Sequence, residues 1–277
     1  MRVTTSAAAL WVLALSTAAG AQSTATCPFS AWTTYEGVSL RRTTDRAAYF
    51  FATTHQRVDA DGAPNAYHPS DVNGTACPAT GRGLDCPANA GYRSNSGSGN
   101  TSWWRDVLVP DPNNNAVAYR QRSGPHAGFF VSQTSLRNVG FAGPRDPRSY
   151  VDAATVPYVV MPSTFHSMAG TGTMGDIGFA LHLDNGRSTP FVFGDAKGSA
   201  AHLGEASIAF WRALGGPNPN PRNGTGMPQG RVAYVVFPRS RLAANLGWPI
   251  DLDRLRAEAT ARLAQIGGIE ALRLCAR

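Results

Sequence analysis

Short apolar runs alternate along this chain with stretches rich in glycine, proline and asparagine. Runs of this kind, bounded by turn residues, are typical of β-strands. They predict strands at 49–58, 107–110, 129–132, 156–162, 175–183, 190–193 and 232–238. The sequence Asp184-Asn185-Gly186 contains an Asn-Gly pair, the strongest short hairpin signal, and it predicts a hairpin that joins strands 175–183 and 190–193.

Helical spacing is confined to two places. Residues 206–214 have the composition of a short helix, and residues 252–266 place Leu252, Leu255, Ala259 and Leu263 on one face. With 29 glycines, 19 prolines and only 16% charged residues, the composition indicates a mainly β protein with many loops. We expect one domain, a closed or partly open β-barrel with short peripheral helices, one of them near the C-terminus. A strand that ends in Gly-Asp favours a double-psi barrel by analogy.

The first 21 residues have the pattern of a secretory signal peptide. Arg2 precedes an apolar run at 7–15, and Ala19-Gly20-Ala21 is a small-residue cleavage pattern. The run is too short for a membrane span, which needs about 18 apolar residues or more. We therefore expect a secreted, extracellular protein whose single domain covers residues 22–277, with no membrane association.

The net charge changes this picture little. It is +7 at pH 7, but the arginines are scattered and no run of basic residues occurs. Nucleic-acid binding needs a basic cluster or a recognisable motif, so we expect no nucleic-acid partner.

The chain has four cysteines, an even number that suits disulfides in an exported protein. Cys77 and Cys86 flank a turn-rich loop, so we expect them to pair and to leave Cys27 and Cys275 to join the two ends. Closing so long a loop stabilises by roughly 4–5 kcal/mol in the chain-entropy model. A zinc site is disfavoured because the chain has no Cys-x-x-Cys pair and no nearby histidine at ligand spacing.

The stretch 190–208, PFVFGDAKGSAAHLGEASI, carries the strongest chemical signal. An apolar strand breaks at Gly194, Asp195 sits at the break, and Glu205 follows a small-residue loop. Two carboxylates that face one cleft are the minimum equipment for hydrolysing a glycosidic bond. The alternative is that Asp195 is a turn residue and Glu205 a helix-start residue, both common roles.

Other candidate residues lie outside this stretch. Asp59 and Asp61 belong to VDADGA, which resembles half of a calcium loop but lacks its later ligands, so we expect no metal. Together with Asp176 they are candidates for binding a cationic substrate. His202 lies between the two acids and is a candidate substrate-binding residue, with a supporting hydrogen bond favoured over a catalytic role. Trp104 is a candidate sugar-stacking residue, although paired tryptophans are more often core.

Three blocks of the sequence together resemble the fungal-type chitosanases of glycoside hydrolase family 75. They are Val58–Ala63, similar to an acidic D-x-D-G-A segment, Tyr150–Pro162, similar to A-x-x-x-P-Y-x-V-x-P, and Gly194–Ser207, similar to G-D-x-x-G…G-E-x-S. The blocks follow the family's order. The chain after Leu214 and the Trp-Trp pair have no counterpart in that pattern.

The resemblance implies inverting endo-hydrolysis of β-1,4-linked glucosamine polymers, with Asp195 and Glu205 as the essential pair. Such a mechanism needs one protonated and one ionised carboxyl, about 6.5–9.5 Å apart. Asp195 emerges from an apolar strand, so desolvation should raise its pKa and suit it to be the general acid. Glu205 lies at an expected helix N-terminus, which favours the anion and the role of general base. We expect both carboxyls to open into one groove.

Two other functions remain open from the sequence. One is a non-catalytic cell-wall or glycan-binding protein on the same scaffold, and the other is a hydrolase of a different glycan such as peptidoglycan. For the hydrolase we expect a monomer that needs no cofactor and takes a chitosan-like polysaccharide as its partner.

Overall fold

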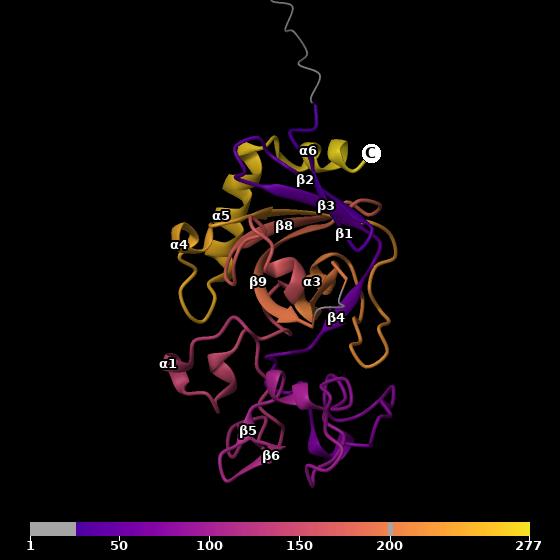
Figure 1. Ribbon diagram of the computed structural model, residues 1–277, viewed down its shortest axis with the longest axis vertical. Coiled ribbons are helices and arrows are strands. Elements are labelled where there is room, and N and C mark those ends of the chain that lie inside the picture. Colours follow the sequence, from indigo (N-terminus) through magenta and orange to yellow (C-terminus); the bar gives the residue numbers. More distant parts are fainter. Residues whose placement is uncertain (1–25, 199–201) are drawn as a thin grey trace, which may run out of the picture.

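The computed structural model describes residues 26–198 and 202–277, and the expected signal peptide lies outside them. A nine-stranded mixed sheet has the order β1-β2-β3-β11-β8-β9-β7-β10-β4 (Figure 1). Its strands are β1 (Ser30–Tyr35), β2 (Val38–Arg42), β3 (Tyr49–Thr53), β4 (Arg57–Asp59), β7 (Tyr158–Pro162), β8 (Ile177–His182), β9 (Ser188–Lys197), β10 (Glu205–Ser207) and β11 (Val232–Phe237). The protein is therefore mainly β, as expected.

Shorter elements surround this sheet. A two-stranded ribbon is formed by β5 (Pro110–Asp111) and β6 (Asn114–Ala118). The α-helices are α1 (Val139–Ala142), α2 (Ser163–His166), α3 (Ile208–Ala213), α4 (Arg241–Ala244), α5 (Leu252–Gln265) and α6 (Gly268–Cys275). Three 3-10 turns lie at Pro69–Asp71, Ser102–Asp106 and Pro147–Ser149.

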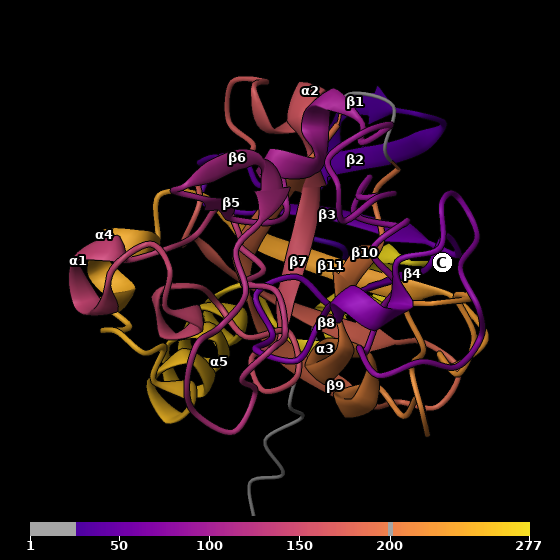
Figure 2. The same ribbon diagram turned by 90° about the horizontal axis from the view of Figure 1, so that it is seen from below.

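The sheet is strongly curved, but its strand pairing is open. Strands β1 and β4 are its two edges among the described residues, so the expected closed barrel is not confirmed. Most pairs are antiparallel, and β9 with β7 and β10 with β4 are parallel. Seen from below, β7, β10 and β4 lie beside α3 (Figure 2). This parallel end of the sheet is where the candidate site is built.

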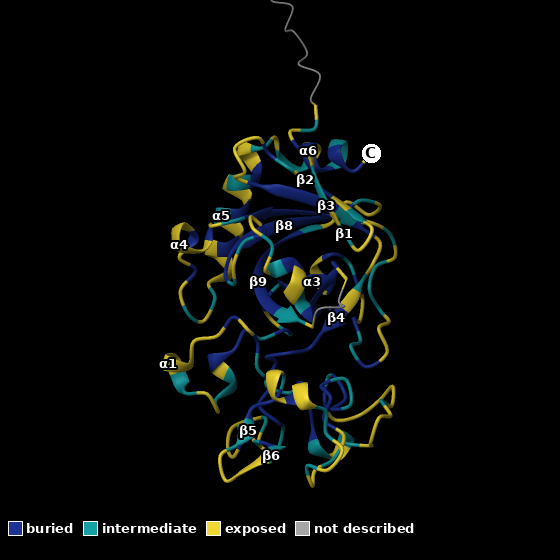
Figure 3. Ribbon diagram, viewed as in Figure 1, coloured by how far each residue is buried: buried dark blue, intermediate teal, exposed yellow. Residues whose placement is uncertain are grey.

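The central strands are buried along their whole length. Every residue of β7, β8 and β11 is buried, the pattern of strands covered on both faces (Figure 3). Helix α5 packs against β8 and β9, α6 packs against β11, and α3 packs against β4, β7, β9 and β10. The long apolar runs in the sequence therefore reflect a sheet buried between helices.

The sequence predicted the central elements well and the peripheral ones poorly. The hairpin between β8 and β9, the strand β11 and the helix α5 are confirmed. The expected strand 49–58 is divided into β3 and β4 by a bend, and residues 129–132 make only isolated bridges. Residues 60–157, at the lower end in Figure 1, are mostly turns and coil.

Gly194 does not end its strand as expected, because β9 continues to Lys197. The register between β7 and β9 shifts at this point, between the pairs Val159↔Phe193 and Val160↔Asp195. A Cβ atom on Gly194 would lie 2.5 Å from Cγ of Tyr158. The glycine therefore lets the tyrosine ring lie directly against β9 at the irregularity, which directs Asp195 toward the site.

Both expected disulfides are present, Cys27–Cys275 and Cys77–Cys86. They are consistent with a protein that folds in an oxidising compartment. Among the described residues, no helix is long and apolar enough to cross a membrane.

Replacing Gly194 by alanine should destabilise the fold by about 1–3 kcal/mol, because the new methyl group clashes with the ring of Tyr158. The matched control is Gly198→Ala, at which an added Cβ has nothing within 4 Å. Urea denaturation of both variants measures the difference. Equal stability of the two variants would contradict this account of Gly194.

Candidate active site

The two acids singled out by the sequence lie in one cross-strand row. Asp195 of β9 and Glu205 of β10 both pair with Val160 of β7, one on each side, and Glu205 also pairs with Arg57 of β4. Residues directly opposite each other project from the same face of a sheet. Because neighbouring strands are about 4.8 Å apart, the backbones of the two acids are roughly 10 Å apart. The sheet therefore sets both the common face and the spacing.

Asp195 belongs to a carboxylate cluster with Asp59 and Asp61. An oxygen of each of these three side chains lies within 4.8 Å of the others. Asp59 ends β4, and Asp61 follows it in the turn that leaves the sheet. The block VDADGA and the block that carries Asp195, far apart in sequence, thus meet in space.

Tyrosine and serine side chains hold the cluster. The hydroxyl of Tyr158 donates to Oδ2 of Asp59 at 3.0 Å and to the carbonyl oxygen of Asp61 at 2.9 Å. The hydroxyl of Tyr67 donates to Oδ1 of Asp61 at 2.7 Å. Each hydroxyl is fixed in place by a buried aromatic ring, so these donors cost little further ordering when they meet a carboxylate.

Asp195 has its own set of donors, which fix the position of Oδ1. This oxygen accepts from the N–H of Ser135 at 2.8 Å, from its hydroxyl at 2.6 Å and from the N–H of Ala196 at 2.8 Å. These three hydrogen bonds thus converge on one oxygen of Asp195. Protonation of Asp195 would leave Oδ1 as the acceptor and place the proton on the other oxygen, Oδ2.

Glu205 is held by cations. Nζ of Lys197 donates to Oε1 of Glu205 at 2.5 Å, and Nε of Arg57 lies 3.6 Å from the same oxygen. Lys197 is two residues after Asp195 in the same strand, so its side chain projects from the same face. The ion pair is therefore part of the site that contains both acids.

The surroundings of the two acids have different effects on their pKa values. Burial raises the pKa of Asp195 to about 7, with Asp59 adding to the effect and the Ser135 donors opposing it. This confirms the expected direction. Burial also raises the pKa of Glu205, but Lys197 and Arg57 oppose that rise. Asp195 is thus suited to hold a proton near neutral pH, while Glu205 has neighbours that stabilise its anion.

Burial likewise raises the pKa of Asp61 well above its usual range, and the charges of Asp59 and Asp195 add to the effect. For Lys197, burial lowers the pKa, but Glu205, Asp59 and Asp61 raise it by more. The lysine therefore stays charged and is the cation that the carboxyl groups share.

Two expectations about Glu205 are wrong. It lies in strand β10, and α3 begins only at Ile208 with Ser207 as its N-cap, so cations rather than a helix dipole favour its anion. The acids also do not open into a groove, because Asp195 is 8% exposed and Glu205 is 3% exposed. The cations that pair with Glu205 are the parts of this centre that meet solvent, since the side chain of Arg57 is 57% exposed and that of Lys197 is 30% exposed.

Two other predicted residues, Asp176 and Trp104, are buried and hold structural roles. Asp176 is fully buried and accepts from the N–H groups of Thr173, Arg239 and Arg241, so it cannot contact a substrate. Trp104 is 1% exposed and packs edge-on against Tyr92, which makes it a core residue rather than a sugar platform.

The exposed member of the tryptophan pair is Trp103, at 43%. His202 packs against His55, with ring centroids 4.7 Å apart, beside a cavity of about 730 Å³. His55 precedes β4 and His202 precedes β10 in the sequence. The N–H of Arg57 donates to the carbonyl oxygen of Gly204, which joins the two segments where these strands begin. Within the described parts of the chain, no hydrogen bond or ion pair joins His202 to Asp195 or Glu205, so its expected role beside the acids is not confirmed.

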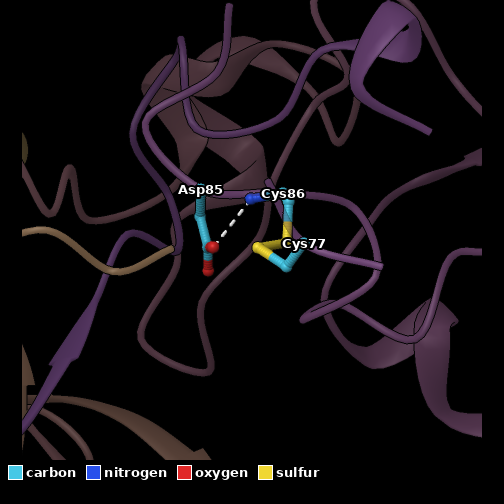
Figure 4. A group of neighbouring side chains, drawn as sticks. All are labelled: Cys77, Asp85 and Cys86. Carbon is cyan, nitrogen blue, oxygen red and sulfur yellow. Dashed lines mark hydrogen bonds between the residues drawn. A yellow bond between two sulfur atoms is a disulfide. The ribbon is translucent and has the colours of Figure 1, made fainter. Parts of the chain in front are cut away.

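The carboxylate cluster is the part of the described chain with the donor chemistry for a hard cation, since it offers three carboxylate oxygens. Several of those oxygens already accept hydrogen bonds from tyrosine and serine hydroxyls and from main-chain N–H groups. A second group, Cys77 with Asp85 and Cys86, is different (Figure 4). Its sulfurs form a disulfide, and only a thiolate binds metal, so this group is structural.

Sequence reasoning missed Lys197 and the two tyrosines. A usable signal for Lys197 was present, because Asp195 and Lys197 stand two apart in a strand and must share a face. Tyr158 lies within the predicted strand 156–162, but nothing local indicates that its hydroxyl reaches β4. Contacts of this kind depend on strand order, which the sequence does not give.

Comparison with known proteins adds no identification. No protein-family model matches the chain, and no curated protein matches it. The likeness to family 75 chitosanases therefore depends on the three sequence blocks alone, and each of them contributes residues to this centre.

The raised pKa of Asp195 predicts how stability depends on pH. Its folded pKa of about 7 is above the ordinary value of about 3.9, so folding takes up a proton between these values. The free energy of unfolding should fall as pH rises from about 4 to about 7 and then level off. Asp195→Asn cannot ionise, so this variant should match the wild type near pH 4 and exceed it by a few kcal/mol above pH 7 in urea denaturation.

The matched control is Asp146→Asn. Hydrogen bonds from Arg148 lower the pKa of Asp146, so its replacement should have the opposite sign and slightly reduce stability at neutral pH. An Asp195→Asn variant no more stable than the wild type at pH 8 would argue against a buried, reluctant carboxylate.

Proposed function

We propose that the protein is a polysaccharide endo-hydrolase that cleaves β-1,4 bonds of a glucosamine-rich polymer by an inverting two-carboxylate mechanism. The observation that carries the proposal is the cross-strand row. It places a carboxyl group with a pKa of about 7 and a cation-paired carboxylate on the same face of one sheet. Pairs of acids whose surroundings push their pKa values apart are the usual arrangement for acid and base roles.

In this mechanism Asp195 protonates the leaving-group oxygen, and Glu205 removes a proton from the water that attacks the anomeric carbon. The backbone spacing of roughly 10 Å, two strand spacings, is of the order needed to fit both a sugar and a water between the carboxyls. Lys197 holds Oε1 of Glu205 in one position and favours its anion. The donors on Oδ1 of Asp195 leave Oδ2 to carry the transferable proton.

The carboxyl groups of the centre support an amino-sugar substrate as hydrogen-bond acceptors. Asp59, Asp61, Asp195 and Glu205 lie together with two cations, Lys197 and Arg57, and the raised pKa values of Asp61 and Asp195 leave no large excess of either charge. At physiological salt, charges beyond about 8–10 Å are largely screened, so this local balance matters more to a bound amino sugar than the net charge of the chain. We propose a secreted enzyme because the N-terminal sequence has the pattern of a signal peptide and both disulfides are formed.

Replacing either acid should lower turnover on chitosan by roughly 10²–10⁴-fold, the usual contribution of a general acid or base. Asp195→Asn should recover part of its activity on an aryl glycoside, because an activated leaving group needs little protonation. Glu205→Gln should not recover, because water is still not activated. Release of reducing ends, measured on chitosan, chitin, cellulose and peptidoglycan, gives both the effect and the polymer preference.

The reverse pattern of rescue would exchange the two roles. Full activity in both variants would rule out the mechanism. Binding of chitosan without hydrolysis by the wild type would instead favour the non-catalytic glycan-binding protein, and hydrolysis of peptidoglycan alone would replace the substrate.

Lys197→Met tests the cation separately from the acids. Without the ammonium group the pKa of Glu205 should rise, because burial is no longer opposed by its nearest cation. The acidic limb of the profile of kcat/KM against pH should therefore move to higher pH. Lys197→Arg should restore much of the wild-type profile. A profile that Lys197→Met does not shift would show that the lysine does not tune the base.

A further inference from the structure

Another pocket, lined by apolar groups and three arginines, lies at the end of the sheet formed by β1, β2 and β3. We call it the arginine pocket. Its volume is about 380 Å³, within the range of small-molecule sites. Its walls include the aromatic rings of Trp32 and Tyr49 and the arginines Arg42, Arg46 and Arg239.

Two of these arginines have an unfavourable backbone conformation. Arg46 has φ of 60° and Arg239 has φ of 66°, in the left-handed region that costs a non-glycine residue roughly 1–2 kcal/mol. The described chain has four such non-glycine residues, the other two being Glu36 and Asn245. It uses glycine at its many other positive-φ positions. Such strain points to a functional requirement for the side chain, and here both strained arginines line the same pocket.

Buried and aromatic groups hold two of the three arginines in place. The N–H of Arg239 donates to Oδ2 of Asp176 at 2.9 Å, which fixes the strained turn after β11. The guanidinium of Arg42 lies over the ring of Trp32, 5.4 Å from its centroid. Asp176, expected from sequence to bind substrate, therefore acts as a support for this pocket.

Among the described residues, the side chains of the three arginines have no acidic partner in direct contact. Within residues 26–198 and 202–277, no salt bridge or side-chain hydrogen bond joins Arg42, Arg46 or Arg239 to an acid. The acids nearby are already engaged, since Asp45 accepts from the N–H of Ala47 and Asp176 accepts from main-chain N–H groups. In the described chain, the three guanidinium groups thus have no carboxylate paired with them.

We propose that the arginine pocket binds an acidic sugar residue, with its ring against the partly exposed Trp32 and its carboxylate on the arginines. Guanidinium groups match a carboxylate with paired hydrogen bonds, and aromatic rings provide an apolar wall for the ring. The choice of a sugar, rather than another ring acid, rests on the proposed action on polysaccharides. The pocket would then anchor the protein to an acidic polymer at a distance from the catalytic acids.

The test is binding of a galacturonic acid oligosaccharide, measured by calorimetry. The variant Arg46→Gly with Arg239→Gly removes both side chains at positions where glycine suits the backbone. It should bind the oligosaccharide at least 10-fold more weakly without a lower melting temperature. The control Arg93→Gln with Arg256→Gln removes the same charge from exposed arginines and should bind as the wild type does. Arg46→Gln with Arg239→Gln provides a second form if the glycine variant does not fold.

Two further ligands test the contributions of the charge and of the sugar ring separately. The methyl ester of the same oligosaccharide has the ring without the charge, and inorganic phosphate has the charge without the ring; both should bind much more weakly. The proposal is overturned if the wild type does not bind the acidic oligosaccharide, or if the ester or phosphate binds equally well. It is also overturned if the pocket variant and the Arg93→Gln, Arg256→Gln control lose affinity equally. Because the readout is binding, none of these outcomes depends on hydrolysis at Asp195 and Glu205.

Discussion

Burial of several carboxyl groups in one small volume is the constraint on which the rest of the candidate site depends. An isolated carboxylate in an apolar interior is strongly disfavoured, and it either takes up a proton or finds partners. Here both solutions occur side by side. Burial raises the pKa of Asp195 to about 7, so this carboxyl holds a proton at lower pH, and Glu205 is paired with Lys197. The tyrosine hydroxyls and main-chain N–H groups satisfy oxygens that neither solution reaches.

The sheet supplies the geometry for this arrangement. Strand β7 pairs with β9 on one side and β10 on the other, so Val160 is the common neighbour of both acids. The register shift opposite Gly194 also contributes to this geometry, because the ring of Tyr158 lies there and its hydroxyl donates to Asp59. An irregularity in one strand thus sets both the direction of Asp195 and the partner of Asp59.

The sequence predicted what depends on local pattern and missed what depends on pairing. Fully buried strands, the Asn-Gly hairpin, α5 and both disulfides each have a signal in neighbouring residues or in cysteine count. The pair Asp195 and Glu205 was also found, as was the direction of the pKa of Asp195. The openness of the sheet, the ion pair with Lys197 and the burial of the acids could not be found. They follow from which strands are neighbours, and a strand as short as β4 has no pattern of its own.

The distribution of charge explains how a chain with a net charge of +7 can hold an acidic centre. The acids of the candidate site are gathered at the parallel end of the sheet, at β4, β9 and β10, whereas Arg42, Arg46 and Arg239 lie at the other end, near β2, β3 and β11. Screening over about 8–10 Å in physiological salt separates the two fields. A cationic sugar would therefore meet the acids, and an acidic sugar the arginines, on one molecule. In this proposal the arginine pocket and the acidic site bind different sugars of a mixed polymer. The net charge of the chain therefore does not argue against a cationic substrate.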